Sequence, residues 1–241
     1  MEKTYKVSYK TYLNDRLKQV FFHGKLTYPL YVQVTFDRKT IFFKSYYFEL
    51  FSKPRYVLFV TGEMHGPSME KIIEKENALI EFLVDKHLPD FSLDLFKQDY
   101  AFYSKDLCDL TEAGFIEYLF VFFHDEGMPA LATTVKEGSK FRILYEVVRD
   151  MKRAFNRPLY DKLVENSFYY APPYLPLYGF MEQTKKWPML SLTVMEWEDP
   201  TTKNSFAEYM LKYYPGKDAG EVIEQVNDWL IHLRKEPDLR P

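Results

Sequence analysis

Cysteine and glycine are both scarce in this chain of 241 residues, and their scarcity argues against several classes of protein. Cys108 is the one cysteine, so no intrachain disulfide can form and a reducing compartment is expected. A lone cysteine also lacks the neighbouring thiols of a zinc knuckle. Nine glycines are few for a propeller or for a glycine-rich nucleotide-binding fold.

Long apolar runs are missing too. The longest, residues 113–123, is interrupted by Glu117 and is shorter than the roughly 18 residues that a membrane-spanning helix needs. The first ten residues lack the apolar core of a signal peptide. We therefore predict no membrane partner and a cytoplasmic location.

Common catalytic and nucleotide-binding motifs are absent as well. The sequence contains no P-loop, no GxGxxG fingerprint, no GxSxG elbow and no HExxH box. Two short clusters contain metal-ligand residue types, His124-Asp125-Glu126 and the pair Glu63 and His65, and we interpret both as solvated polar groups. We predict no catalytic residue, no metal, no cofactor and no enzymatic activity, although carboxylates that meet only in the folded chain would leave no local trace.

Aromatic residues are what the sequence has in excess. Twenty Tyr and 21 Phe, with a hydrophobic content of 46%, supply a bulky core and exclude a disordered chain. The order of strand-like and helix-like segments predicts an α+β protein, with a small N-terminal antiparallel β-sheet followed by a mainly α-helical body. Three domains are expected: a sheet at 1–62, a helical domain at 67–166, and a Pro/Tyr-rich arm with a short strand and two terminal helices at 167–241.

Residues 28–51 carry the clearest fold signal and predict a β-hairpin. Apolar residues alternate with polar or aromatic ones along 30–35, the two-residue period of a strand with one buried face. The turn is expected at 37–39 and a second strand at 40–51. A first strand at 3–13 completes three strands, about the minimum for an independent sheet. The predicted buried set is Leu30, Val32 and Val34, and the opposite set is Tyr31, Gln33 and Thr35.

Charge is distributed unevenly along the chain. Residues 1–60 contain eleven basic and four acidic side chains, a net charge of +7, whereas residues 61–241 carry −10. A basic β-rich segment on an acidic body is typical of a protein that binds a polyanion. Lysines that guard the edges of a solvated sheet would produce the same pattern, and the charge count does not choose between the two.

Helical periodicity prevails after residue 67. Ser68 is a suitable N-cap for the first helix and Thr111 for the third. The fourth helix is expected to be long, despite the helix-weakening Gly138 within it. The expected helices are 68–86, 93–103, 111–127, 131–155, 203–214 and 218–235.

Three arginines are spaced regularly in the fourth predicted helix. Arg142, Arg149 and Arg153 lie at intervals of seven and four residues, so a continuous helix would align them on one flank. Guanidinium groups in such a row suit phosphate oxygens. A solvated face, partly neutralised by Glu146 and Asp150, is the alternative.

The segment 168–187 differs from the rest because it combines prolines with tyrosines. Pro172, Pro173 and Pro176 predict that regular structure is absent there, and a short strand is expected at 190–194. The tyrosines could stack on bases, pack against the chain itself or pack against a partner protein. They are Tyr169, Tyr170, Tyr174 and Tyr178.

The N-terminal features fall in a recognisable order. They are a first strand around Tyr5 and Tyr9, then Gly24, the run Pro29-Leu-Tyr-Val-Gln-Val, the turn Asp37-Arg38-Lys39, and Phe43-Lys44-Ser45. In this order they resemble the arm-type DNA-binding domain of the tyrosine recombinases, or phage-type integrases, of Bacteroidetes and their mobile elements. The resemblance implies a three-stranded sheet that inserts into DNA, followed by a helical core-binding domain. The linker-like helix 68–86, Phe115-Ile-Glu-Tyr-Leu and Thr133-Thr134 extend the likeness over about two thirds of the chain.

The catalytic set of that family is not matched. Recombinase chemistry needs an Arg, a Lys, a His-x-x-Arg box and a Tyr nucleophile in a catalytic domain of its own. The nearest candidate, His232-Leu-Arg234, has the wrong spacing, and no tyrosine follows it. The resemblance therefore implies a non-catalytic DNA-binding protein whose partner is double-stranded DNA. The predicted DNA-binding residues are Tyr31, Gln33, Arg38, Lys39, Lys44, Arg142, Arg149 and Arg153.

A structural or adaptor protein is the alternative hypothesis. In that case the aromatic segment 168–187 would dock onto a partner protein, and the acidic body would disfavour DNA. An exposed apolar patch on the segment would favour the adaptor. A continuous basic face on the N-terminal sheet would favour the DNA-binding protein.

Overall fold

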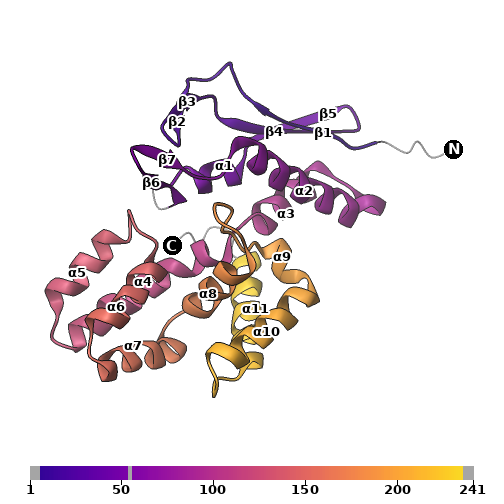
Figure 1. The fold of residues 1–241 in the computed structure, drawn as a ribbon. Helices are drawn as coiled ribbons and strands as arrows, with labels where there is room; N and C mark the ends of the chain where they lie inside the picture. The colour runs from indigo at the N-terminus through magenta and orange to yellow at the C-terminus, as the bar shows by residue number, and fades with distance from the viewer. Residues whose placement is uncertain (1–5, 54–55, 236–241) are drawn as a thin grey trace. The chain divides into compact units, whose positions relative to one another are not determined.

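The computed structural model describes residues 6–53 and 56–235 and confirms the α+β class (Figure 1). The chain forms two compact units, Met1–Lys105 (unit 1) and Asp106–Pro241 (unit 2). The strands of the described residues all belong to unit 1, together with three α-helices. The described part of unit 2 is helical.

Unit 1 is built around a three-stranded antiparallel sheet in the order β1 (Ser8–Leu13), β4 (Leu30–Phe36) and β5 (Lys39–Lys44). The small antiparallel sheet predicted from the sequence is thereby confirmed. A two-residue turn joins β4 to β5, and its residues Asp37 and Arg38 both have positive φ, 45° and 63°. Such a left-handed pair is typical of a type I′ turn, whose twist matches that of the flanking strands.

Two separate hairpins complete the β-structure of unit 1. They are β2 (Val20–Phe22) with β3 (Lys25–Thr27), and β6 (Leu58–Val60) with β7 (Glu63–His65). Tyr5, which belongs to the first predicted strand, lies outside the described residues.

The strand predicted at 40–51 is wrong beyond Lys44, because the chain turns into α1 (Tyr46–Phe51). The Ser45 side chain accepts a hydrogen bond from the backbone N–H of Phe48 at 3.1 Å and so caps this helix. Aromatic residues favour strands only when they pack on a pleated surface, and here they pack as a helix instead. The buried residues of α1 are Tyr47, Phe48, Leu50 and Phe51, which have helical spacing.

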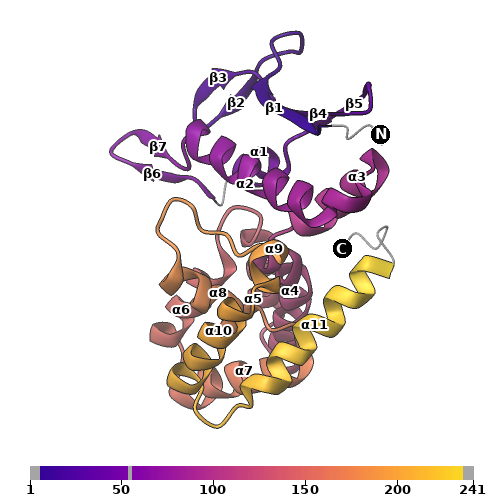
Figure 2. The same cartoon turned by 90° about the vertical axis from the view of Figure 1, so that its right-hand side faces the viewer.

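Helices cover one face of the sheet (Figure 2). They are α2 (Met69–His87), the short 3-10 helix η2 (Leu88–Asp90) and α3 (Leu93–Tyr103). The α2 and α3 helices match their predicted ranges to within one residue, and Ser68 caps α2 as expected. The predicted domain boundary at 62–67 falls inside unit 1.

The covered face of the sheet forms the core of unit 1. Leu30, Val32 and Val34 are fully buried, as the alternation along β4 predicts. Phe43 of β5 packs against Tyr100 of α3, with ring centroids 4.4 Å apart. Because side chains alternate along a strand, the residues between these point to the opposite face.

Unit 2 is a set of packed helices. Asp106 caps the first of them by accepting a hydrogen bond from Asp109 N at 2.8 Å, whereas the predicted cap, Thr111, lies inside the helix. Among residues 6–53 and 56–235, no helix combines the length and the apolar character that crossing a membrane requires. The helices are α4 (Leu107–Asp125), α5 (Pro129–Gly138), α6 (Leu144–Ala154), α7 (Arg157–Tyr170), α8 (Tyr174–Thr184), α9 (Val194–Glu198), α10 (Pro200–Tyr213) and α11 (Ala219–Lys235).

The single helix predicted at 131–155 is wrong. Two helices, α5 and α6, occupy this stretch, and residues 139–143 separate them. Gly138 is the last residue of α5, where its conformational freedom makes helix continuation less favourable. Ile143 is extended, with ψ of 119°, and α6 starts after it.

The absence of regular structure predicted for 168–187 is also wrong. Pro172 and Pro173 lie between α7 and α8, and Pro176 lies in the first turn of α8. A proline is tolerated there because the first backbone N–H groups of a helix have no partner within it. The strand predicted at 190–194 is reduced to one isolated bridge between Asp106 and Thr193.

Aromatic rings and sulfur atoms fill the core of unit 2. Trp197 is fully buried and packs edge-on against Phe206, with ring centroids 5.2 Å apart. Cys108 is only 3% exposed, and its Sγ lies 3.8 Å from the Sδ of Met181. The thiol therefore serves as a core side chain of α4.

Candidate functional site

The candidate site is the face of the β1-β4-β5 sheet that no described element of unit 1 covers, and we call it the open sheet face. Its side chains form three rows across the strands, because residues opposite each other in an antiparallel sheet share a face. The rows are Ser8, Thr35 and Thr40; Lys10, Gln33 and Phe42; and Tyr12, Tyr31 and Lys44.

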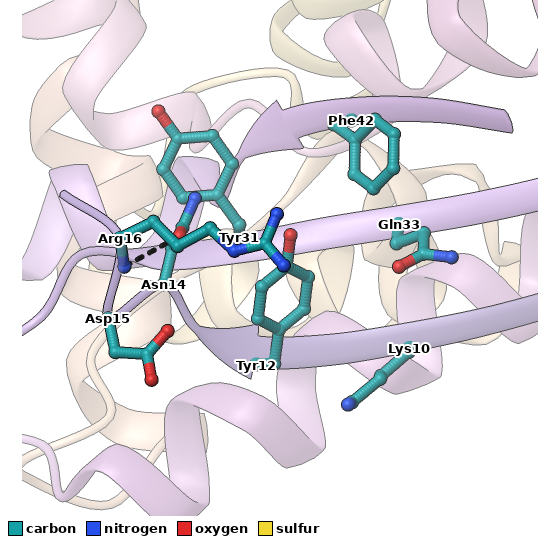
Figure 3. Close-up of a pocket in the computed structure, with 8 residues that line it drawn as sticks. All are labelled: Lys10, Tyr12, Asn14, Asp15, Arg16, Tyr31, Gln33 and Phe42. Carbon is teal, nitrogen blue, oxygen red and sulfur yellow. Dashed lines mark hydrogen bonds between the residues drawn. The ribbon is translucent and has the colours of Figure 1, made fainter.

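A shallow groove of about 600 Å³ runs over this face (Figure 3). It is closed at one end by the turn after β1, where Asn14 N donates to the Pro29 carbonyl at 2.9 Å. The Asn14 side chain in turn accepts a hydrogen bond from Arg16 N at 3.3 Å, which fixes the backbone of Arg16 beside the groove. The lining residues are Lys10, Tyr12, Asn14, Asp15, Arg16, Tyr31, Gln33 and Phe42.

The charges of the open sheet face lie at its margins. Lys44 Nζ is 2.8 Å from the Glu49 carboxylate, so this charge is partly compensated. Lys10 and Arg16 form no ion pair with another described residue. The middle of the face is aromatic and amide in character, not continuously basic. Cations at the edge of a polar and aromatic surface can hold phosphates while the centre contacts bases.

The predicted residues of the N-terminal segment are only partly brought together. Tyr31, Gln33 and Lys44 share the open sheet face. Arg38 lies in the turn at the far end of β4 and is exposed. Lys39 is opposite Phe36, whose ring packs 4.9 Å from that of Phe91 between η2 and α3. Lys39 therefore lies on the helix-covered side of the sheet and extends from its end.

The arginine row predicted in unit 2 is wrong. Arg142 lies in the segment between α5 and α6 and cannot align with the other two along one helix. Arg149 and Arg153 do lie one turn apart on α6. Arg149 Nη1 is 2.9 Å from the Glu182 carboxylate of α8, which leaves it less available for a phosphate.

The four tyrosines of 168–187 divide into a buried and an exposed pair. Tyr174 and Tyr178 are 1% and 4% exposed, and the Tyr174 hydroxyl donates to the Glu112 carboxylate at 3.1 Å. Tyr169 and Tyr170, at the end of α7, are 69% and 74% exposed. The exposed large apolar side chains of this segment are therefore these two tyrosines and Trp187, which is 46% exposed.

Six residues that line the groove over the open sheet face were not predicted as site residues: Lys10, Tyr12, Asn14, Asp15, Arg16 and Phe42. Lys10 and Tyr12 come from β1, Arg16 from the following turn and Phe42 from β5. Alternation along each strand indicates which residues share a side, but only the register shows that Tyr12 lies opposite Tyr31. The sequence signal that could have identified Tyr12 was the alternation along β1, which matches the alternation along β4.

One buried carboxyl group, with two hydroxyl groups that donate to it, lies on the helix-covered side of the sheet. Glu76 of α2 is buried and accepts hydrogen bonds from Ser45 Oγ and from the Tyr100 hydroxyl, the latter at 2.5 Å. Burial raises the pKa of the Glu76 carboxyl to about 7. These bonds join α1, α2 and α3, which makes this carboxyl group part of the core. The described residues contain no group of three or more His, Cys, Asp and Glu side chains placed to hold a metal ion.

None of the protein-family models, curated proteins and solved structures compared with this chain matches it. The relationship to integrases remains an expectation from the sequence. Function is therefore inferred from the chemistry of the site, because a fold by itself does not determine an activity.

Proposed function

We propose that this chain is a non-catalytic DNA-binding protein, allied to mobile-element integrases, that contacts DNA through the open sheet face. The observation that carries the proposal is the division of the sheet into a face packed on helices and an uncovered face bearing Lys10, Gln33 and Tyr31. A three-stranded sheet is narrow enough to enter a major groove about 12 Å wide. We place the protein in the cytoplasm, where its single cysteine stays reduced.

The residue types on this face suit the two kinds of contact that DNA offers. The Gln33 amide can pair with the edge of adenine through one donor and one acceptor. Lys10, Arg16 and Arg38 can contact phosphates around it, with Lys44 shared between a phosphate and Glu49. Phosphate contacts would set the position of the sheet, and Gln33 would supply a sequence preference.

The dependence of affinity on salt tests this proposal. With about four phosphate contacts, affinity for labelled DNA should fall roughly 100-fold between about 50 and about 200 mM salt, because binding releases counterions. The double variant R38E/K39E should reduce the slope of this dependence by about one unit, because Arg38 is placed for a phosphate contact whereas Lys39 extends from the covered side of the sheet.

The matched control is R234E/K235E, which reverses an adjacent Arg and Lys at the end of α11 in unit 2. We expect it to leave the salt slope unchanged. Failure to bind either duplex or single-stranded DNA at low salt would contradict the proposed function. Equal effects of the two double variants would show that net charge, not the open sheet face, determines binding.

A second candidate, an adaptor protein, is favoured by one observation on unit 2. Tyr170 lines a groove of about 540 Å³ together with Val121, which is 55% exposed, and Tyr118. Tyr169 is less free to dock, because its hydroxyl contacts both Glu165 and Lys217. Tyr170 is therefore the residue on which partner binding would depend.

Its test is a binding measurement with a partner isolated from the cells that make this chain. The Tyr170→Ala variant should weaken the purified complex at least about tenfold if Tyr170 is a central contact of the interface. Tyr213→Ala, which removes another exposed tyrosine of unit 2, is the control. Equal affinities of the Tyr170→Ala variant and the parent chain would dismiss the adaptor.

A further inference from the structure

We infer that the open sheet face also binds single-stranded nucleic acid, by stacking unpaired bases on Tyr12, Tyr31 and Phe42. This inference rests on the proposed function and specifies the form of nucleic acid that the same site takes. Each of the three strands contributes one ring. Aromatic platforms of this kind accept any base, because every base has a flat π-face.

The register brings the three rings into one neighbourhood. Tyr12 and Tyr31 are direct cross-strand partners, and Phe42 is opposite Gln33, which places it diagonally from Tyr31. Direct and diagonal cross-strand neighbours are both within reach of aromatic side chains. Figure 3 shows the three rings on the same side of the sheet, with Gln33 beside Phe42.

Of the three rings, Phe42 is the one whose exposure is not explained by packing in the core. It is 59% exposed, and no ring contact joins it to another aromatic side chain of the described residues. Its neighbour Phe43, by contrast, packs against Tyr100 in the core. A single exposed apolar residue is ordinary, but Phe42 extends a surface already formed by two tyrosines and flanked by cations. Such a surface fits a ligand with flat rings and negative charge.

Stacking, rather than charge, favours unpaired over paired bases. Arg16 lines the groove beside Asp15 and forms no ion pair with a described residue, and Lys10 Nζ lies 5.4 Å from the centroid of the Tyr12 ring. Lys44 is held by Glu49, and Lys39 extends from the other side of the sheet. Both forms of nucleic acid can make phosphate contacts with Arg16 and Lys10, but paired bases offer only their edges to the rings. A single strand can add stacking to the same phosphate contacts.

The experiment compares three labelled ligands with the full chain at about 50 mM salt: an oligothymidine of about 12 nucleotides, an oligouridine of that length, and a hairpin duplex with as many phosphates. We expect at least one single strand to bind roughly tenfold or more tightly than the duplex, and the ratio of the two strands tells whether DNA or RNA is the ligand. Phe42→Ala should weaken single-strand binding roughly 5- to 100-fold, the effect of removing one stacked base, and should leave duplex binding within about twofold.

Two control variants make the result specific to stacking. Phe42→Trp should retain single-strand binding, because it keeps a ring at this position. Phe141→Ala removes a ring of unit 2 that is 66% exposed and should change nothing. A second platform variant, Tyr12→Ala, should weaken single-strand binding as Phe42→Ala does. Circular dichroism would verify that both alanine variants remain folded.

The outcomes separate this inference from the function on which it rests. Binding of the duplex without binding of either single strand would overturn the inference and leave the proposed function standing. Single-strand binding that neither Phe42→Ala nor Tyr12→Ala weakens would exclude the aromatic platform. Absence of binding to all three ligands would overturn both.

Discussion

Glu76 gives unit 1 a dependence on pH that can be worked out from one side chain. Its pKa in the folded chain is about 7, raised by burial from an ordinary value of 4.5. Between these values the folded state keeps a proton that the unfolded state has released. The stability of unit 1 should therefore be greatest below about pH 4.5, as far as Glu76 is concerned, and should fall as the pH rises through 7.

Replacement of this carboxyl by an amide tests the assignment. In the parent chain, the free energy of unfolding should decrease by about 2 kcal/mol between about pH 5 and about pH 7.5 as Glu76 ionises. In Glu76→Gln this decrease should be absent, because glutamine does not titrate. Urea unfolding followed by circular dichroism at the two pH values measures it. Tryptophan fluorescence is the internal control, since Trp187, Trp197 and Trp229 all belong to unit 2. The same pH dependence in Glu76→Gln and the parent chain would disprove the role of Glu76.

Helix packing in unit 2 depends on a close approach at Gly179 of α8. A Cβ at this position would lie 2.1 Å from the Tyr209 hydroxyl of α10 and 2.9 Å from the Tyr145 hydroxyl of α6. Gly179→Ala should lower the stability of unit 2 by about 1–3 kcal/mol, since overpacking outweighs the gain in helix propensity. Chemical unfolding followed by tryptophan fluorescence measures the change.

Gly138→Ala is the matched control for this packing. Nothing lies within 4 Å of a Cβ built there, so the substitution should stabilise unit 2 by up to about 1 kcal/mol through helix propensity alone. The two alanine variants should therefore shift stability in opposite directions. A stabilised Gly179→Ala variant would show that the tyrosine side chains move aside at little cost.

Elements with a strong period and a clear cap were predictable from the sequence. The α2 and α3 helices have serine caps and amphipathic faces, and β4 has strict alternation. The errors occurred where one residue type allows two structures. A run of aromatic residues serves a strand or a helix equally, as at α1, and a proline can begin a helix as well as end one, as at α8.

The candidate site was predictable only in part for a related reason. Alternation along β4 assigned Tyr31 and Gln33 to the face opposite the core. The residues that accompany them depend on the register of β1 and β5, which the turns between the strands set. Lys39 is the clearest example of what the sequence did not show. It was predicted as part of the turn and as a DNA-binding residue, but the register places it on the covered side of the sheet.

The two units differ less in net charge than the basic first 60 residues and the acidic remainder of the chain indicate. Unit 1 contains sixteen basic and thirteen acidic residues, because the acidic helices α2 and α3 fold onto the basic sheet. Unit 2 contains sixteen basic and twenty-two acidic residues. At physiological salt, charges separated by more than about 8 Å are largely screened. Binding of a nucleic acid should therefore depend on the short-range contacts of the open sheet face rather than on long-range attraction.

The buried thiol of Cys108 has a practical consequence for the chemistry of this protein. A thiol reagent can reach it only when unit 2 opens, because this side chain of α4 is buried in the core of unit 2 against Met181. It is also the one cysteine of the sequence. Unit 1 contains no sulfhydryl group and is silent to such a reagent. The rate of covalent labelling in mild denaturant therefore reports the opening of one half of the molecule, without any added probe or any cleavage of the chain.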